Sequence, residues 1–318
     1  MTPSQLKAYS AVVRLGSVKA AAAELDVSEA AVSLHVGQLR KELGDQLFTR
    51  TGSGLAFTPG GLRLASRAVE LLGLRARTVQ EVRQAGGGRR LLRLGVSDLF
   101  AEYAAPGLIE SFTARAADLD VELSTDGPRR FEALLVTRGL DAAIAPRVNF
   151  VGRDVNSSHF LNYEVVAVAT AGHPVVTSQP SLNVLREQRW LLGPSATEQG
   201  GIVAEMLRRL AIPEQQQRIF QSHAAALEEA KRGHGITLTV GFVVTSELKE
   251  GSLVQVDGPM LRGRGEWSIA TLAGTQAPSA AAELRRFVAT PRATQAMLNR
   301  RGAGVGRFRP SVHVTLWS

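Results

Sequence analysis

The three consecutive glycines at residues 86–88 separate two parts of the chain that differ in periodicity. Before them, apolar residues recur every three or four positions, which is the spacing of amphipathic helices. After them, short apolar segments alternate with helical ones, which predicts a mostly parallel sheet with crossover helices. The 318 residues are enough for two or three domains with ordinary cores. We therefore expect a small N-terminal domain and a larger α/β domain that forms two lobes with a cleft between them.

The N-terminal part has the pattern of short helices joined by tight turns. One helix is predicted to end at Gly16, and Ser17 is suited to cap the next, because a serine oxygen accepts the free amides at a helix start. A third helix is predicted at residues 28–43 with Ser28 as its cap. Residues 47–57, with a glycine-rich turn in the middle, predict a two-stranded wing. This order is typical of a winged helix-turn-helix.

A long helix is predicted to follow Thr58 and Pro59, because threonine caps helices and proline suits their first turn. Its apolar residues are spaced by three or four positions, close to the seam of a coiled coil. We expect residues 59–88 to form a dimerising linker helix that ends in a glycine hinge. The seam is formed by Leu62, Ala65, Val69, Leu72, Ala76, Val79 and Val82.

The net charge of +8 is concentrated at the two ends of the chain. Residues 1–90 contain 13 basic and 7 acidic side chains, whereas residues 91–299 contain 20 basic and 22 acidic ones. The last nineteen residues add four arginines and no acid. A small basic module joined to a nearly neutral larger one is typical of a protein that binds a polyanion through one part and another ligand through the other.

The residue content excludes several classes of protein. The absence of cysteine excludes disulfides, cysteine-ligated metals and thiol catalysis, and the six histidines lack the spacing of a metal site. No segment has the roughly 18 unbroken apolar residues of a membrane span, and the first thirty residues do not form a signal peptide. Motifs of serine hydrolases and phosphate-binding loops are also absent. We therefore expect a cytoplasmic protein that is not an enzyme, with no cofactor, no metal and no membrane partner.

The first seventy residues contain a long ungapped series of short motifs. They are Gln5-Leu6, Gly16-Ser17-Val18, Ala21-Ala22, Leu25, Val27-Ser28, Ala31-Val32-Ser33, Leu39, Glu42-Leu43-Gly44, Gln46-Leu47-Phe48, Arg50, Leu55 and Thr58-Pro59-Gly60-Gly61. Shorter matches follow at residues 94–97, 139–144 and 233–236. With these motifs the chain resembles the LysR-type transcriptional regulators, a family of bacterial DNA-binding proteins.

The resemblance implies a fold class and a division of the chain. Residues 1–58 would form a winged helix-turn-helix, residues 59–88 the linker helix, and residues 89–300 an α/β effector domain with two lobes like those of periplasmic binding proteins. It also implies a homotetramer, built as a dimer of dimers, that binds an interrupted palindrome in double-stranded DNA. The other partners would be an unidentified small-molecule effector and RNA polymerase. The basic tail at residues 301–318 extends past the usual family end, as an arm or as an added edge strand that packs on a neighbouring subunit.

The resemblance also assigns the residues that would contact DNA. The recognition helix would be residues 28–43, and four residues depart from the family pattern: Glu29 and Ala30 replace Gln-Pro, Leu34 replaces a frequent arginine, and Arg40 replaces a common glutamate. We therefore expect base readout that relies on thymine methyl contact or on DNA shape. The predicted DNA-binding residues are Ser28, Glu29, Ser33, Leu34, His35 and Gln38, with Arg50 and Thr51 in the wing.

Matching positions in the effector domain give a second set of candidates. They are Ser97, Asp98, Ser195, Thr197, Ser222 and His223. A fixed negative charge at Asp98 would repel an anion, so we expect a neutral, cationic or metal-bound effector. Structural roles stay open for four of them: Asp98 as a helix cap, Ser195 and Thr197 as caps or turn residues, and His223 as an ordinary buried or surface histidine.

Two other functions remain open on the sequence alone. A two-lobed α/β domain can host catalysis, although its catalytic residues would have to be assembled entirely by the fold. Alternatively, the chain could be a DNA-architectural or ligand-independent repressor whose second domain only oligomerises.

Overall fold

The computed structural model describes residues 1–52, 54–146, 154–176, 180–198, 200–258 and 260–299. The arm or strand predicted at residues 301–318 lies outside this set. The chain forms two compact units, one of Met1–Gly88 with Val136–Gly139 and the other of Arg89–Leu135 with Leu140–Ser318. Within the described ranges, no helix has the length and apolar character needed to cross a membrane.

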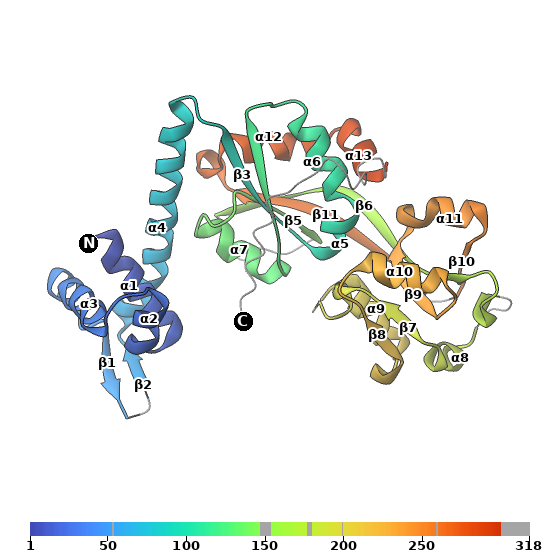
Figure 1. Cartoon of the computed structure of the whole chain (residues 1–318), viewed down its shortest axis with the longest axis horizontal. Helices are drawn as coiled ribbons and strands as arrows, with labels where there is room; N and C mark the ends of the chain where they lie inside the picture. Colours follow the sequence, from blue (N-terminus) through green and yellow to red (C-terminus); the bar gives the residue numbers. More distant parts are fainter. Residues whose placement is uncertain (53, 147–153, 177–179, 199, 259, 300–318) are drawn as a thin grey trace. The chain divides into compact units, whose positions relative to one another are not determined.

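The first unit is helical except for a two-stranded wing (Figure 1). Its helices begin where a hydroxyl accepts a free amide: Ser17 from Ala20, at 3.2 Å, and Ser28 from Ala31, at 3.1 Å. Thr58 likewise begins the long helix, and the predicted caps are confirmed. The elements are α1 (Pro3–Leu15), α2 (Val18–Glu24), α3 (Glu29–Leu43), β1 (Phe48–Thr51), β2 (Gly54–Phe57) and α4 (Pro59–Ala85).

One apolar core holds helices α1, α2 and α3 against the wing. Tyr9 of α1 stacks on Phe48 of β1, with ring centroids 6.4 Å apart, and Phe48 meets Phe57 of β2 edge to face. Val36 and Leu39 of α3 are buried in the same cluster. Burying these side chains removes apolar surface from water and fixes which face of α3 points outward.

Arg40 explains one departure from the family pattern. Its guanidinium donates to the carbonyl oxygens of Gln46 and Phe48, each at 2.6 Å, and lies over the Phe48 ring, 4.6 Å from the centroid. A glutamate cannot donate these hydrogen bonds. Arg40 therefore ties α3 to the wing.

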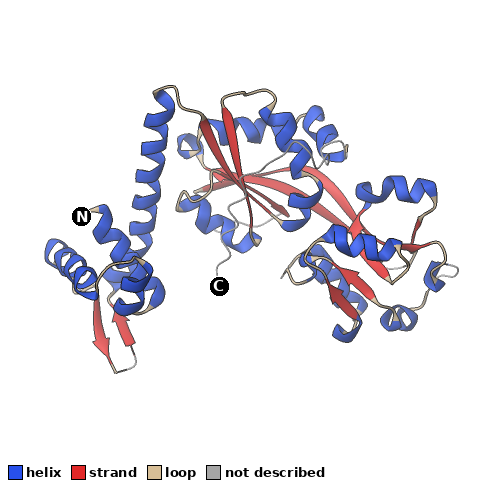
Figure 2. Ribbon diagram, in the orientation of Figure 1, coloured by secondary structure: helices blue, strands red, loops and turns tan. Residues whose placement is uncertain are grey.

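The second unit is a mixed sheet flanked by helices (Figure 2). Its strand order is β4-β3-β5-β11-β6-β9-β7-β8, and β10 pairs with β6. The elements are β3 (Arg90–Val96), α5 (Asp98–Tyr103), α6 (Ala105–Thr113), β4 (Leu119–Thr125), α7 (Pro128–Val136), β5 (Ala142–Pro146), β6 (Val155–Thr170), η1 (Pro174–Val176), α8 (Leu182–Glu187), β7 (Trp190–Leu192), η2 (Pro194–Ala196), α9 (Ile202–Leu210), η3 (Glu214–Gln216), β8 (Gln217–Ile219), α10 (His223–Lys231), β9 (Ile236–Val240), η4 (Gly241–Val244), α11 (Thr245–Glu250), β10 (Leu253–Gln255), β11 (Arg262–Leu272), η5 (Gly274–Gln276), α12 (Ser279–Val288) and α13 (Pro291–Leu298).

Two long strands, β6 and β11, join the two lobes of this unit. Lobe 1 contains β3, β4 and β5, and lobe 2 contains β7, β8 and β9. Strands within each of these trios pair in parallel, but β6, β10 and β11 all pair antiparallel with their neighbours. The prediction of a mostly parallel sheet is therefore wrong for the strands that span the lobes, since these strands return directly and need no crossover helix.

Two glycines give opposite predictions for the stability of the first unit. A Cβ at Gly61, in the first turn of α4, would collide with the Leu47 carbonyl and lie 2.7 Å from the Tyr9 hydroxyl oxygen. Gly37, inside α3, has open space around the same position. We expect Gly61→Ala to lower the free energy of unfolding by about 2 kcal/mol through overpacking. Gly37→Ala should raise it by roughly 0.5–1 kcal/mol through helix propensity.

Urea unfolding of the full-length protein, followed by circular dichroism, measures both effects. Equal changes in the two variants would contradict the packing of α4 on the wing.

Candidate functional site

The outward face of α3 is the first candidate site. Val32, Val36 and Leu39 point into the core, whereas Ser33 and Leu34 are exposed. Leu34 is 60% exposed, which is high for a large apolar side chain in an otherwise polar helix face. The recognition helix predicted from the sequence thus has the surface that a major-groove contact requires.

The other predicted DNA-binding residues lie on the same helix or on the wing. Ser28 and Glu29 are exposed at the start of α3, and Arg50 and Thr51 are exposed on β1. His35 is half-buried, and its Nδ1 is buried without a hydrogen-bond partner.

Gln38 is exposed on α3 but is held from within the unit. Its side-chain oxygen accepts a hydrogen bond from the Gln5 amide at 2.8 Å. This bond fixes the rotamer of Gln38 and leaves its own amide group to donate. The contact of all these residues with DNA stays a prediction.

A surface pocket lies between α3 and the wing. Ser33 lines it together with Arg40 and Arg50, so its rim is basic. The Arg40 guanidinium is engaged with the Gln46 and Phe48 carbonyl oxygens, whereas Arg50 is exposed. A free guanidinium binds phosphate oxygens in two-pronged geometry, so Arg50 makes this pocket a suitable place for the DNA backbone. Its lining consists of Val18, Ser33, Val36, Arg40, Gln46, Phe48, Thr49 and Arg50.

In the second unit, three side chains form a chain of hydrogen bonds between the lobes. The Ser195 hydroxyl oxygen lies 2.8 Å from His223 Nε2, and His223 Nδ1 lies 3.0 Å from a carboxylate oxygen of Glu102. Glu102 is on α5, Ser195 is in η2, and His223 begins α10. The sequence predicted Ser195 and His223 as candidates, but Glu102 was missed.

Glu102 also binds the start of α10. Its carboxylate accepts the backbone amides of His223, at 2.8 Å, and Ala224, at 2.5 Å. Burial acts to raise the pKa of Glu102, but the hydrogen bonds from His223 and from these amides outweigh it and lower the pKa below its usual value. A helix N-terminus stabilises negative charge, so Glu102 is held as a carboxylate.

The order serine, histidine and carboxylate is also that of a nucleophilic relay. Ser195 is only 1% exposed, however, and its hydroxyl is engaged with His223. A substrate carbonyl has to reach within about 3 Å of a nucleophile, and the Ser195 hydroxyl is not open to one in the arrangement of the lobes that the structure shows. The three groups are therefore better described as a polar connection between the lobes.

Ser97 and Asp98 lie together at the start of α5. Ser97 occupies the cap position but its hydroxyl makes no cap hydrogen bond, and this buried oxygen has no partner. Asp98 is the first residue of the helix, so the interpretation of Asp98 as the cap is wrong. Burial raises the pKa of Asp98; the charges of Glu102 and Asp126 raise it further, and His223 acts in the opposite direction.

Thr197 and Ser222 have local backbone roles. The Thr197 hydroxyl donates to the Pro194 carbonyl at 2.9 Å, and Ser222 caps α10 by accepting from the Ala225 amide at 3.1 Å. The turn role predicted for Thr197 is confirmed, the cap at Ser222 is a finding of the structure, and contact with an effector stays a prediction for both.

Two residues that the sequence did not single out belong to the same neighbourhood. Burial and the charge of Asp98 raise the pKa of Glu198, against a smaller effect of His223. Tyr163 is 5% exposed and its hydroxyl has no partner; burial and the charge of Glu198 raise its pKa. The Tyr163 ring stacks on Trp267, with centroids 4.2 Å apart.

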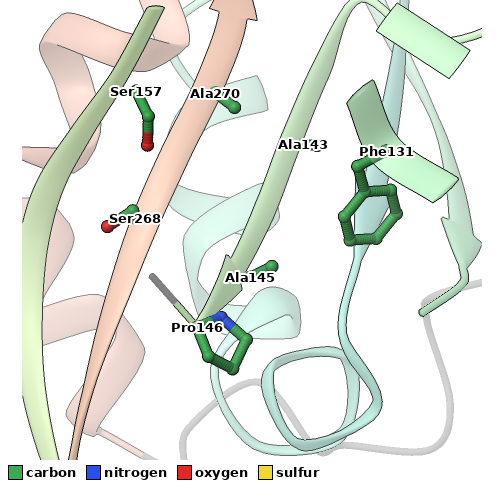
Figure 3. A pocket seen from close by; sticks show the side chains of 7 residues that line it. All are labelled: Phe131, Ala143, Ala145, Pro146, Ser157, Ser268 and Ala270. Atoms are coloured by element: carbon green, nitrogen blue, oxygen red, sulfur yellow. The ribbon is translucent and has the colours of Figure 1, made fainter. Parts of the chain in front are cut away.

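A separate small cavity lies beside β5 (Figure 3). Its volume is about 10 Å³, which is the space of one water molecule. It is therefore too small for an effector. The cavity is lined by Phe131, Ala143, Ala145, Pro146, Ser157, Ser268 and Ala270.

In the ranges that the structure describes, no three His, Asp or Glu side chains are grouped so that they could hold a metal ion.

The Glu102 contacts predict a pH-dependent contribution to stability. Glu102→Gln should lower the free energy of unfolding of the full-length protein by about 2 kcal/mol at pH 7, because charge-assisted hydrogen bonds are lost. The folded pKa lies below the usual value of 4.5, so the contribution is complete above pH 4.5 and disappears as the pH falls through the folded pKa. Urea unfolding at pH 7 and below pH 4 tests this, with the exposed Glu110→Gln as the control. A difference between wild type and Glu102→Gln that does not change with pH would contradict it.

Known proteins resemble both units. Residues 3–62 match the family "Bacterial regulatory helix-turn-helix protein, lysR family", and residues 85–291 match "LysR substrate binding domain". A similar protein is an uncharacterized HTH-type transcriptional regulator of Mycobacterium tuberculosis, 57% identical over 321 residues and 100% of both chains.

Two solved structures share the fold, each at 18% identity. One is full-length CbnR in complex with its target DNA, with a TM-score of 0.57 over 91% of this chain and 100% of CbnR. The other is LysG from Corynebacterium glutamicum with bound effector Arg, with a TM-score of 0.60 over 93% of this chain and 99% of LysG. The chain belongs to the LysR family of transcriptional regulators, with an N-terminal helix-turn-helix domain and a C-terminal two-lobed effector-binding domain.

Proposed function

We propose that this regulator binds an interrupted palindrome in double-stranded DNA as a homo-oligomer and changes transcription when a small molecule binds where the two lobes meet. The observation that carries the proposal is the outward face of α3. Its exposed Ser33 and Leu34 stand on a helix whose opposite face is fixed in the core. A serine hydroxyl can bond a base edge, and a leucine can contact a thymine methyl group.

The apolar residues on α4 support self-association. Leu62, Val69, Val79 and Val82 of the predicted seam are each at least 40% exposed in the single chain. Such a stripe on a long helix is suited to pack against a second copy, because pairing removes it from water. Two such dimers would form the tetramer. RNA polymerase would be the partner through which the bound protein acts on transcription.

For the effector we propose a site built from both lobes. Ser97 and Asp98 come from lobe 1, and Ser195, Thr197, Ser222 and His223 come from lobe 2. Hydrogen bonds from Glu102 through His223 to Ser195 connect the two lobes. A ligand that contacts either lobe would change the environment of these three side chains, which supports a coupling between ligand binding and lobe closure. No cofactor is part of the proposal.

Two alternatives are distinguished by simple observations. A ligand-independent architectural repressor would bind DNA equally well with any small molecule present. Catalysis by the line of Ser195, His223 and Glu102 would need turnover of an ester or amide that is lost in Ser195→Ala. The burial of Ser195 and the regulators among the relatives favour the effector-responsive function.

Electrophoretic shifts on the DNA upstream of the protein's own gene test the proposal. With non-specific competitor and a salt series, we expect specific binding that weakens as salt rises, because phosphate contacts release counterions. Ser33→Ala and His35→Ala should each weaken specific binding by roughly fivefold to tenfold. Ser158→Ala and His159→Ala, exposed on β6, are the matched controls and should bind as the wild type does. Unchanged affinity in the α3 variants, with unchanged melting temperatures, would contradict the contact assignment.

A further inference from the structure

We propose that the effector is an organic cation, whose ammonium or guanidinium group is held by the carboxylates of Asp98 and Glu198. This inference rests on the proposed function, since it names the ligand class of the same site. It comes from two independent features of the second unit: a pair of unpaired acids and a set of buried hydroxyls without partners.

The two acids lie on different lobes, and among the described residues no lysine or arginine pairs with either of them. Asp98 begins α5 and Glu198 follows η2, and α5 packs against both η2 and α10. In the described part of the chain, neither side-chain carboxylate makes a hydrogen bond or an ion pair. Acidic side chains that are partly removed from water normally find a partner, because leaving a charge unpaired costs free energy.

The charged groups around the pair do not neutralise it. The groups that act on Asp98 are Glu102, Asp126 and His223, and those that act on Glu198 are Asp98 and His223. His223 is the basic group among these, and both of its ring nitrogens are already engaged, with Glu102 and with Ser195. The site therefore has an excess of negative charge, which repels a carboxylate ligand and attracts a cation.

Buried hydroxyls at the same place also lack partners. Ser97 is 2% exposed and Tyr163 is 5% exposed, and the structure gives neither hydroxyl a hydrogen bond. Ser97 is next to Asp98 in the chain, and the charge of Glu198 acts on the Tyr163 hydroxyl. Trp267 contacts both Tyr163 and helix α5. Its ring stacks on Tyr163 and meets the Phe100 ring of α5 edge to face, with ring centroids 5.0 Å apart.

The two carboxylates and the two buried hydroxyls can all accept hydrogen bonds from a ligand. Ionised carboxylates only accept hydrogen bonds, and hydroxyls can accept as well as donate. An ammonium group has three N–H donors and a guanidinium has five, so either can satisfy several of these oxygens at once and neutralise the acids. In the described ranges, the acidic and histidine side chains are not grouped as a metal site, which favours an organic head group.

The charge of the ligand can be tested with compounds of matched shape. Four compounds that differ in net charge would be titrated into the full-length protein by calorimetry. Agmatine and L-arginine have a net positive charge, L-citrulline has an α-ammonium and an α-carboxylate group and no net charge, and L-glutamate has a net negative charge. We expect agmatine and arginine to bind, and citrulline and glutamate to bind at least tenfold more weakly. Asp98→Asn and Glu198→Gln should each weaken agmatine binding by about tenfold, because each removes a charge-assisted hydrogen bond. Glu110→Gln, an exposed glutamate on α6, should leave it unchanged.

A second readout needs no ligand. If the Asp98 and Glu198 carboxylates have no cationic partner in the ligand-free protein, Asp98→Asn and Glu198→Gln should each raise the melting temperature at pH 8. The reason is that an acid whose pKa is raised by folding destabilises the folded state at any pH above that pKa. The inference is overturned if both variants melt lower than the wild type. Absence of binding by agmatine and arginine, equal binding of citrulline and arginine, or Mg²⁺ binding that depends on the same two acids would also overturn it.

DNA binding by the same samples separates this inference from the proposed function. Specific DNA binding with no response to cations would overturn the ligand class and leave the regulator intact. Charge-dependent agmatine binding without any specific DNA binding would contradict the proposed function and support the assignment of Asp98 and Glu198.

Discussion

The half-buried carboxylate of Glu102 is the contact on which the second unit most depends. It accepts two backbone amides at the start of α10 and binds His223, which in turn contacts Ser195. A helix start needs partners for its free amides, and here the partner comes from the other lobe. Because one side chain satisfies a helix of lobe 2 from a helix of lobe 1, the position of the lobes is tied to an electrostatic contact. A ligand that alters this contact can alter the arrangement of the lobes.

The first unit shows the same dependence of function on buried contacts. Leu39 and Phe48 hold α3 and the wing together, and Arg40 adds hydrogen bonds between them. The exposed residues of α3 are therefore presented by a rigid helix. Recognition of DNA requires this, because base contacts depend on the placement of a few side chains in the groove.

Much of the fold could be predicted because its signals are local. Ser28 and Thr58 mark helix starts through hydrogen bonds to amides three residues away, and family motifs cover the first seventy residues without a gap. The first part of strand β6 gives no local signal, since residues 156–159 are polar and exposed and form no apolar run. Glu102 was missed because its partner His223 is 121 residues away. One local signal was available: Asp98 and Glu102 are four residues apart, so both lie on one face of a helix.

Recognition of DNA by α3 requires that the protein bind a specific palindromic site. DNase I footprinting of the full-length protein on the DNA upstream of its own gene tests it most directly. We expect two protected half-sites related by a dyad, with centres separated by a whole number of turns of roughly 10.5 base pairs each. Weak protection spread evenly along the fragment, at protein concentrations that saturate it, would contradict the claim.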